Sequence, residues 1–379
     1  MIKKIIYFFS LTLFIASCRE TYTPPEITID QNILVIDGFV NVGGDSSFFK
    51  LSRSQKLGTT NVNKPETLAK ISILTANNAV LAQSVEKPNG QYAVRSNMVT
   101  ANQSYKVRIV TKDAKEYITD LIAAKTAPAI DSVNWSIDAE KNGIQFYASS
   151  KDVSNNTRYY KWDCEETWES RAYFESYYKY LGGLNVVVRD SVDQIYRCWK
   201  SSPITGIFIG SSAKLASDVV ENEKLHFIPK GVDKLNTRYS VLVKQTTLTK
   251  EAYEYWQQLK QMTELGGSVF DVQPTQLYGN ITSVANTTEP VIGYITASSV
   301  TTKRIFIDRS QVTSFVTPNV LNCEVYVVSG HPDTFNLYFN NRRYVPIAGD
   351  VNGGFLAATL SCGDCRVFGG VTTRPPFWQ

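Results

Sequence analysis

Short strand-like runs at regular spacing constrain the fold of this chain more than any other feature. After residue 32, apolar or alternating segments rich in Tyr, Val, Thr and Ile recur about every 10–20 residues, and these residue types favour strands. Turn signals such as Gly43-Gly44-Asp45 and Asn77-Asn78 separate the runs. The pattern predicts a mainly β protein whose residues 33–127 form an immunoglobulin-like antiparallel sandwich.

A larger β-rich region, residues 128–379, is predicted to follow the sandwich, and one helix interrupts it. Apolar side chains recur at helical spacing between residues 252 and 262. Thr249 is a suitable N-cap before them, and Gly266-Gly267 is a suitable stop after them. We therefore expect a helix at about 249–265.

The first eighteen residues have the pattern of a lipoprotein signal peptide. Two lysines precede a short apolar run, and the small residues Ala16 and Ser17 stand before Cys18. The run of about 12 residues is too short to span a bilayer, which needs about 20. We expect removal of residues 1–17, a diacylglycerol on Cys18 and an extended tether over residues 18–32. A plain signal peptide followed by an accidental cysteine is the alternative.

Such a signal would place the protein outside the cytoplasm and hold it to a membrane through lipid. Arg19 follows Cys18, where an aspartate would favour retention at the inner membrane. We therefore expect an outer-membrane lipoprotein. The sequence leaves open whether it faces the cell surface or the periplasm.

Composition argues against several classes of function. Loss of Lys3 and Lys4 with the signal lowers the formal charge from +4 to +2, which is too little for a nucleic-acid-binding surface. The two histidines, His226 and His331, are isolated, so neither a three-histidine zinc site nor a Ser-His-Asp triad is expected. We expect a protein that is not an enzyme, carries no metal or cofactor and has no nucleic-acid partner.

Five cysteines remain after Cys18, and cysteines of an exported protein are expected to pair. An odd number leaves at least one thiol free. We interpret Cys362-Gly-Asp-Cys365 as a small structural disulfide, with pairing to Cys323 as the alternative.

Aromatic residues gather between positions 159 and 180. Trp162, Trp168 and Tyr177 are the candidate binding or interface residues, because aromatic side chains anchor partners and stack on ligands. Most of the cluster is nevertheless expected to pack in a core, since cores use the same residues. The adjacent Glu165 and Glu166 would point to opposite faces of a strand, so they are not expected to share a substrate.

An ordered set of short motifs resembles a known family. In chain order after the signal, the motifs are Ile36-Asp37-Gly38, Lys50-Leu51-Ser52-Arg53-Ser54, Pro128-Ala-Ile-Asp131-Ser132, Trp162-x-x-Glu165-Glu166-Thr167-Trp168, Arg197-Cys198-Trp199, Phe270-Asp271-x-Gln273-Pro274, Gly279-Asn280-Ile281, Pro290-Val-Ile-Gly293-Tyr294, Cys362-x-Asp364-Cys365-Arg366 and Pro376-Phe377-Trp378. Over nearly its whole mature length, the chain resembles the Bacteroidota outer-membrane lipoproteins of domain of unknown function 4249.

The resemblance implies a role rather than a reaction. Members of that family are often encoded beside TonB-dependent outer-membrane receptors, which implies an accessory to uptake or export. We therefore expect a non-enzymatic docking partner of such a receptor, by analogy and not from a site. The alternative is a stand-alone glycan- or peptide-binding lipoprotein that uses the aromatic surface.

Overall fold

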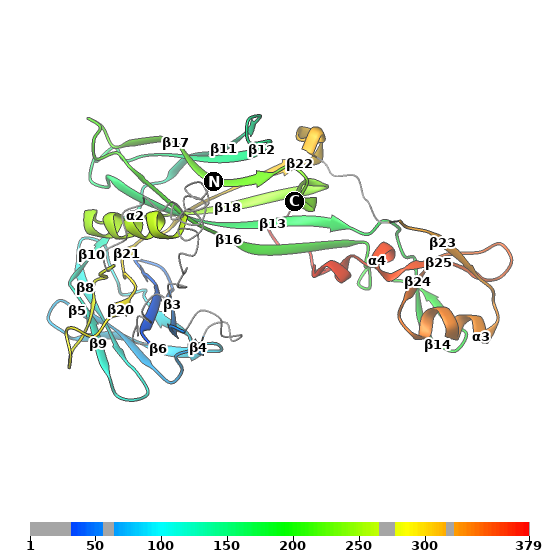
Figure 1. Ribbon diagram of the computed structural model, residues 1–379, viewed down its shortest axis with the longest axis horizontal. Helices are drawn as coiled ribbons and strands as arrows, with labels where there is room; N and C mark the ends of the chain where they lie inside the picture. Colours follow the sequence, from blue (N-terminus) through cyan, green and yellow to red (C-terminus); the bar gives the residue numbers. More distant parts are fainter. Residues whose placement is uncertain (1–31, 56–63, 265–276, 316–321, 379) are drawn as a thin grey trace, which may run out of the picture.

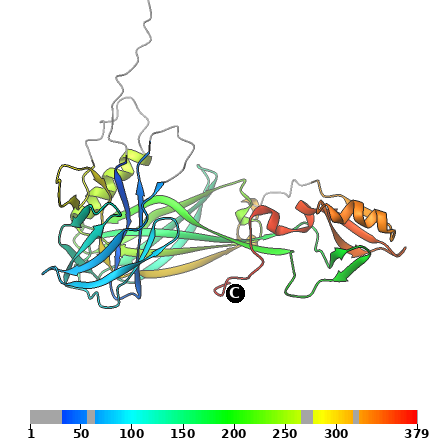
Figure 2. The same cartoon turned by 90° about the horizontal axis from the view of Figure 1, so that it is seen from below.

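The computed structural model describes residues 32–55, 64–264, 277–315 and 322–378, which form three bodies along an elongated molecule (Figures 1 and 2). An N-terminal β body and a central sandwich lie together, and a smaller head lies at the far end. We use "the head" for residues 172–196 and 322–371. The predicted fold class is confirmed: the chain is mainly β, with an immunoglobulin-like N-terminal part followed by a larger β-rich part that carries one long helix.

The N-terminal body is a curled sheet whose strands alternate buried and exposed residues. In β8, for example, Tyr105, Val107 and Ile109 are buried while their neighbours are partly exposed, as expected for a strand with one face on a core. The strands are β1 (Leu34–Gly38), β2 (Val40–Asn41), β3 (Ser46–Arg53), β4 (Lys64–Pro65), β5 (Lys70–Thr75), β6 (Val80–Lys87), β7 (Gln91–Arg95), β8 (Ser104–Val110), β9 (Glu116–Thr119), β10 (Ile122–Lys125), β19 (Ile281–Ser283), β20 (Val291–Ile292) and β21 (Ala297–Ser298).

The last three of these strands come from far along the chain. Strand β19 pairs antiparallel with β9, while β20 pairs parallel with β1, and β21 pairs parallel with both β2 and β10. A Cβ atom at Gly293 would lie 2.3 Å from the Ile36 carbonyl oxygen, so this close approach requires glycine. Residues 281–298 therefore complete the N-terminal sheet. The predicted boundary at residue 127 assigns them to the C-terminal region instead, because it divides the chain by sequence position alone.

The central sandwich consists of a three-stranded and a four-stranded sheet. Trp162 is fully buried in its core and donates its indole N–H to the Gln245 Oε1 atom at 2.8 Å. Gln245 in turn donates to the Pro128 carbonyl oxygen and the Ser150 Oγ atom, so the buried indole N–H and side-chain amide are both satisfied. The three-stranded sheet consists of β11 (Ile130–Asp138), β12 (Gly143–Lys151) and β17 (Val219–Pro229). The four-stranded sheet consists of β16 (Arg197–Ser211), β13 (Tyr159–Arg171), β18 (Arg238–Thr247) and β22 (Thr301–Asp308). The short helical turns are η1 (Asp233–Leu235), η2 (Arg309–Gln311) and η3 (Thr313–Phe315).

Helix α2 (Lys250–Glu264) confirms the predicted helix, and it lies where the first two bodies meet (Figure 1). The Thr249 hydroxyl accepts a hydrogen bond from the Ala252 amide at 3.2 Å, which is the expected N-cap. The buried side of the helix packs Ala252 against Ile209 of the central sandwich. The Tyr255 ring lies 5.1 Å from that of Tyr294, a residue of the returning segment. The helix thereby connects the two bodies through side-chain packing.

The head is built from two separate stretches of sequence that pack on each other. Two hydrogen bonds illustrate the contact between the stretches. The Ser176 hydroxyl donates to the Pro346 carbonyl oxygen at 2.8 Å, and the Tyr177 amide donates to the Ile347 carbonyl oxygen. The elements are β14 (Tyr178–Gly182), β15 (Asn185–Val188), β23 (Val325–Val328), α3 (Pro332–Phe335), η4 (Asn336–Asn340), β24 (Tyr344–Gly349), β25 (Phe355–Thr359), α4 (Leu360–Gly363) and η5 (Cys365–Phe368).

Candidate interaction site

Two long strands carry the head away from the central sandwich. Strands β13 and β16 pair antiparallel along almost their whole lengths, from Tyr159 opposite Ser211 to Arg171 opposite Arg197. Figures 1 and 2 show this pair leading from the sandwich to the head. The head therefore sits at one end of the elongated molecule, where a second protein can approach it.

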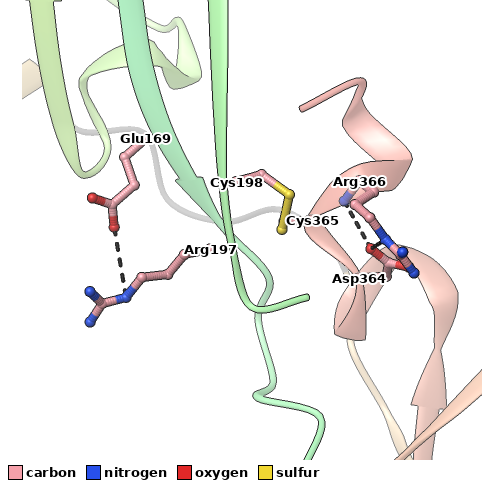
Figure 3. Close-up of a disulfide and its surroundings, with 6 residues drawn as sticks. All are labelled: Glu169, Arg197, Cys198, Asp364, Cys365 and Arg366. Atoms are coloured by element: carbon pink, nitrogen blue, oxygen red, sulfur yellow. Dashed lines mark hydrogen bonds and ion pairs between the residues drawn. A yellow bond between two sulfur atoms is a disulfide. The ribbon is translucent and has the colours of Figure 1, made fainter. Parts of the chain in front are cut away.

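Two disulfides fasten the head, and they correct the predicted pairing. Cys198 at the start of β16 bonds to Cys365 in η5 (Figure 3), and Cys323 bonds to Cys362. The predicted Cys362–Cys365 disulfide is therefore wrong, whereas the alternative pairing to Cys323 holds for Cys362. The C-x-x-C spacing was misleading because α4 ends between the two cysteines and each faces a different neighbour.

The fifth cysteine is free, as an odd number requires. Cys164 is buried in the central sandwich, and burial raises the pKa of its thiol to about 12. A thiol is reactive only as the thiolate, so this one is a packing residue.

Ion pairs and the C-terminal segment reinforce the junction around Cys198. Figure 3 shows the bidentate pair of Arg366 with Asp364 and the contact of Glu169 with Arg197 at 4.0 Å. Glu169 also lies 2.8 Å from Arg171. The segment after η5 then returns along the arm, where the backbones of Trp199 and Val371 exchange two hydrogen bonds. The junction between arm and head is thus held by covalent, ionic and backbone contacts together.

The head exposes an unusual share of apolar side chains. Thirteen of the 26 large apolar side chains exposed among the described residues lie in the head, although the head holds fewer than a quarter of those residues. At the tip of the β14–β15 hairpin, Leu181 and Leu184 flank the two turn glycines and are 59% and 56% exposed. Apolar residues concentrated in this way mark interaction sites.

An unpaired strand edge adds to this surface. In the sheet order β23-β25-β24, strand β23 has no second partner among the described strands. Its Val325 and Val327 side chains are exposed, and apolar edge strands are surfaces on which other chains pair. The hairpin tip and this edge together make the head the candidate interaction site.

The three aromatic residues predicted to bind a partner do not form one surface. Trp162 and Trp168 are buried in the core of the central sandwich, so a binding role for them is wrong. Trp168 contributes instead to packing, with the Lys234 ammonium 4.9 Å from its ring centroid. Tyr177 is 52% exposed and lies in the head, directly before the hairpin strand β14.

The two adjacent glutamates lie on opposite faces of β13, as their positions in a strand predict. Glu165 is partly exposed and pairs with Lys244 at 3.1 Å. Glu166 is buried, where it pairs with Lys234 and accepts a hydrogen bond from the Tyr239 hydroxyl at 3.1 Å. Each carboxylate thus has its own basic partner.

His226 lies beside this buried carboxylate and gives a prediction for acid stability. Burial lowers the pKa of the His226 imidazole below 6.5 although Glu166 opposes the shift. The unfolded chain therefore binds this proton more readily, so the stability is present above pH 6.5 and is lost as the pH falls through the lowered pKa. We expect His226→Phe to reduce the loss of urea resistance between pH 7.5 and pH 5. His331→Phe, at the exposed histidine, should leave that loss unchanged; equal slopes in the two variants would contradict the prediction.

The predicted lipidation residue Cys18 lies outside the described residues, as do the signal peptide and most of the tether. Among the residues that are described, no helix is long and apolar enough to cross a bilayer. The missed contributors to the head are Cys198 and the stretch 322–371. Cys198 had one signal in the sequence, since it is one of the five cysteines expected to pair in an exported protein.

Comparison with known proteins gives distant structural likeness and one family. A two-domain fibronectin type III segment of chicken tenascin shares 11% identity and covers 57% of this chain and 91% of its own, with a TM-score of 0.15. The BSP domain of a biofilm-associated protein shares 7% identity over 87% of this chain and 76% of its own, also with a TM-score of 0.15. No curated protein matches the chain. The family model described as domain of unknown function DUF4249 matches residues 19–304, most of the sequence, and the chain therefore belongs to the DUF4249 family.

Proposed function

We propose that this protein is a Bacteroidota outer-membrane lipoprotein, anchored through Cys18, whose head docks on a TonB-dependent receptor as a non-enzymatic accessory to uptake or export. The observation that carries the proposal is the apolar tip of the β14–β15 hairpin at the far end of the molecule. A loop tip in water is normally polar, so Leu181 and Leu184 there need a protein surface to cover them.

The disulfides support export. Cys198–Cys365 and Cys323–Cys362 both fasten the head, and disulfides persist in oxidising compartments outside the cytoplasm. This fits a chain whose first residues have the signal pattern ending at Cys18. The chain also belongs to the DUF4249 family. The receptor partner is inferred from the resemblance to lipoproteins encoded beside TonB-dependent receptors.

A stand-alone glycan- or peptide-binding function through the aromatic cluster has lost its main support. Trp162 and Trp168 are in the core, which leaves Tyr177 as one exposed ring without the other two. Single exposed aromatic side chains are common on protein surfaces and specify no ligand.

The test is affinity purification of the tagged full chain from its native outer membrane in mild detergent, with mass spectrometry of the co-purifying proteins. We expect a TonB-dependent receptor in stoichiometric amount, and none with Cys18→Ala. The Leu181→Glu/Leu184→Glu variant should lose the receptor because charges cannot be buried at an apolar contact. Val153→Glu, at an apolar residue of the central sandwich that is 83% exposed, is the matched control and should keep it. Recovery of the lipoprotein alone, or equal recovery with both glutamate variants, would overturn the proposal.

A further inference from the structure

The head contains an open cavity of about 800 Å³ that adjoins the hairpin tip, with Leu181 and Gly182 in its lining. Its walls come from strand β14, from η4 and the start of β24, and from α4 and η5, so both stretches of the head contribute. The volume is in the range of sites that hold small organic ligands, and it is far larger than one inorganic ion needs.

Positive charge dominates the lining. Lys179, Arg189, Arg342 and Arg366 line the cavity, and Asp364 is the one carboxylate among the lining residues. Arg366 is neutralised by its bidentate pair with Asp364, and Lys179 pairs with Asp193. Two guanidinium groups, Arg189 and Arg342, make no ion pair with a described residue.

Arg189 is positioned by neutral acceptors. Its Nε atom donates to the Ser176 hydroxyl and its Nη1 atom donates to the Asp193 carbonyl oxygen, both at 3.2 Å. Burial and the nearby Arg366 lower the pKa of the Arg189 guanidinium below its ordinary value, although the carboxylates of Asp364 and Asp193 oppose the shift. A half-buried cation without an ion-pair partner is costly, and an anion placed in the cavity would relieve that cost.

Aromatic side chains form another part of the wall. Tyr180, Phe339 and Tyr344 line the cavity, and the rings of Tyr180 and Phe339 are 5.5 Å apart. The Tyr180 hydroxyl is held by the Asn336 side chain. Fixed aromatic surface beside guanidinium groups suits a ligand that has both a ring and a negative charge, because arginine pairs with carboxylates and phosphates in a fork-like geometry.

We propose that this cavity binds an anionic saccharide, a sugar-sized ring that carries a carboxylate or a phosphate. The anionic group pairs with Arg189 and Arg342, and the ring lies against the aromatic wall. The cavity adjoins the hairpin tip, because Leu181 and Gly182 also line it. The proposal is tested on the isolated chain, so its outcome does not depend on a receptor partner.

The test is calorimetric titration of the full chain with two probes, trigalacturonate and glucose 6-phosphate, and with maltotriose as the neutral control. We expect one of the anionic probes to bind, with an affinity that falls as salt is raised. Arg342→Asn should weaken it by about tenfold or more, since hydrogen bonds to charged groups are strong. Arg342 has φ +55°, a conformation that asparagine tolerates, so this variant keeps the backbone.

Arg343→Asn is the matched control, because Arg343 is the exposed next residue and does not line the cavity. The Arg343→Asn variant should bind the probe as the unaltered chain does. The Arg189→Gln variant should bind it more weakly, although its side-chain amide is long enough to approach the Ser176 hydroxyl. The proposal is overturned if neither anionic probe binds at millimolar concentration, if maltotriose binds equally well, or if Arg342→Asn and Arg343→Asn bind alike. Trigalacturonate binding alone identifies the carboxylate form of the ligand, and glucose 6-phosphate binding alone the phosphate form.

Discussion

Replacing Cys198 and Cys365 together with serine is expected to loosen the head from the end of the β13–β16 arm. The disulfide joins residues 167 positions apart in sequence, and a crosslink that closes so long a loop contributes about 2–5 kcal/mol. The backbone hydrogen bonds between Trp199 and Val371 lie directly beside this disulfide, because Trp199 follows Cys198 in the chain. We expect the amide protons of Trp199 and Val371 to exchange with solvent at least about tenfold faster in the variant, because local opening becomes easier.

Hydrogen exchange is the suitable measurement, because a chain with several bodies need not unfold in one step and a single melting temperature would mix them. The comparison variant is Cys323→Ser/Cys362→Ser, which removes the disulfide with the shorter separation of 39 residues inside the head. It should leave exchange at Trp199 and Val371 slow. Equal exchange at these two residues in both variants would show that the Cys198–Cys365 disulfide does not hold the junction.

Local features of the fold could be predicted from the sequence, whereas distant pairings could not. Helix α2 followed from the spacing of its apolar residues and from Thr249, both of which lie within one stretch. The strand character of residues 281–298 was also visible. Their parallel pairing with β1, β2 and β10 was not, because alternation marks a strand but does not name its partner.

The head escaped prediction for the same reason. It forms only when residues 172–196 meet residues 322–371, and the disulfide partner of Cys365 is set by that meeting. Cysteine spacing within Cys362-Gly-Asp-Cys365 carries information on neither distant neighbour. The basic cavity likewise depends on contacts between the two stretches.

The burial of Trp162, in contrast, could have been predicted from its own strand. Lys161, Asp163 and Glu165 occupy one face of β13, and Trp162 lies on the other face with Tyr160 and Glu166. Period-two alternation assigns the polar set to solvent and the aromatic set to the core. Counting aromatic residues over 159–180 without this alternation made two core side chains look like a binding surface.

Trp162→Ala is accordingly expected to destabilise the central sandwich by about 3–5 kcal/mol, the usual cost of removing a large buried aromatic side chain. The substitution also leaves the Gln245 Oε1 atom without its donor inside the core. Gly210 on β16 lies against the indole ring, where a Cβ atom would come within 2.9 Å of it, so the surrounding sheet is shaped to this side chain. Denaturant unfolding followed by circular dichroism measures the change.

Tyr177→Ala is the matched control, because Tyr177 belonged to the same predicted set but is exposed in the head. Its effect on unfolding should stay within about 0.5 kcal/mol, as for most surface substitutions. A stable Trp162→Ala protein, or a Tyr177→Ala protein destabilised as strongly, would contradict the placement of the two residues. The two variants also separate folding from docking. If the head binds the receptor, Tyr177→Ala can reduce the amount of receptor recovered without any loss of stability. Trp162→Ala can reduce it only by unfolding the sandwich that supports the arm.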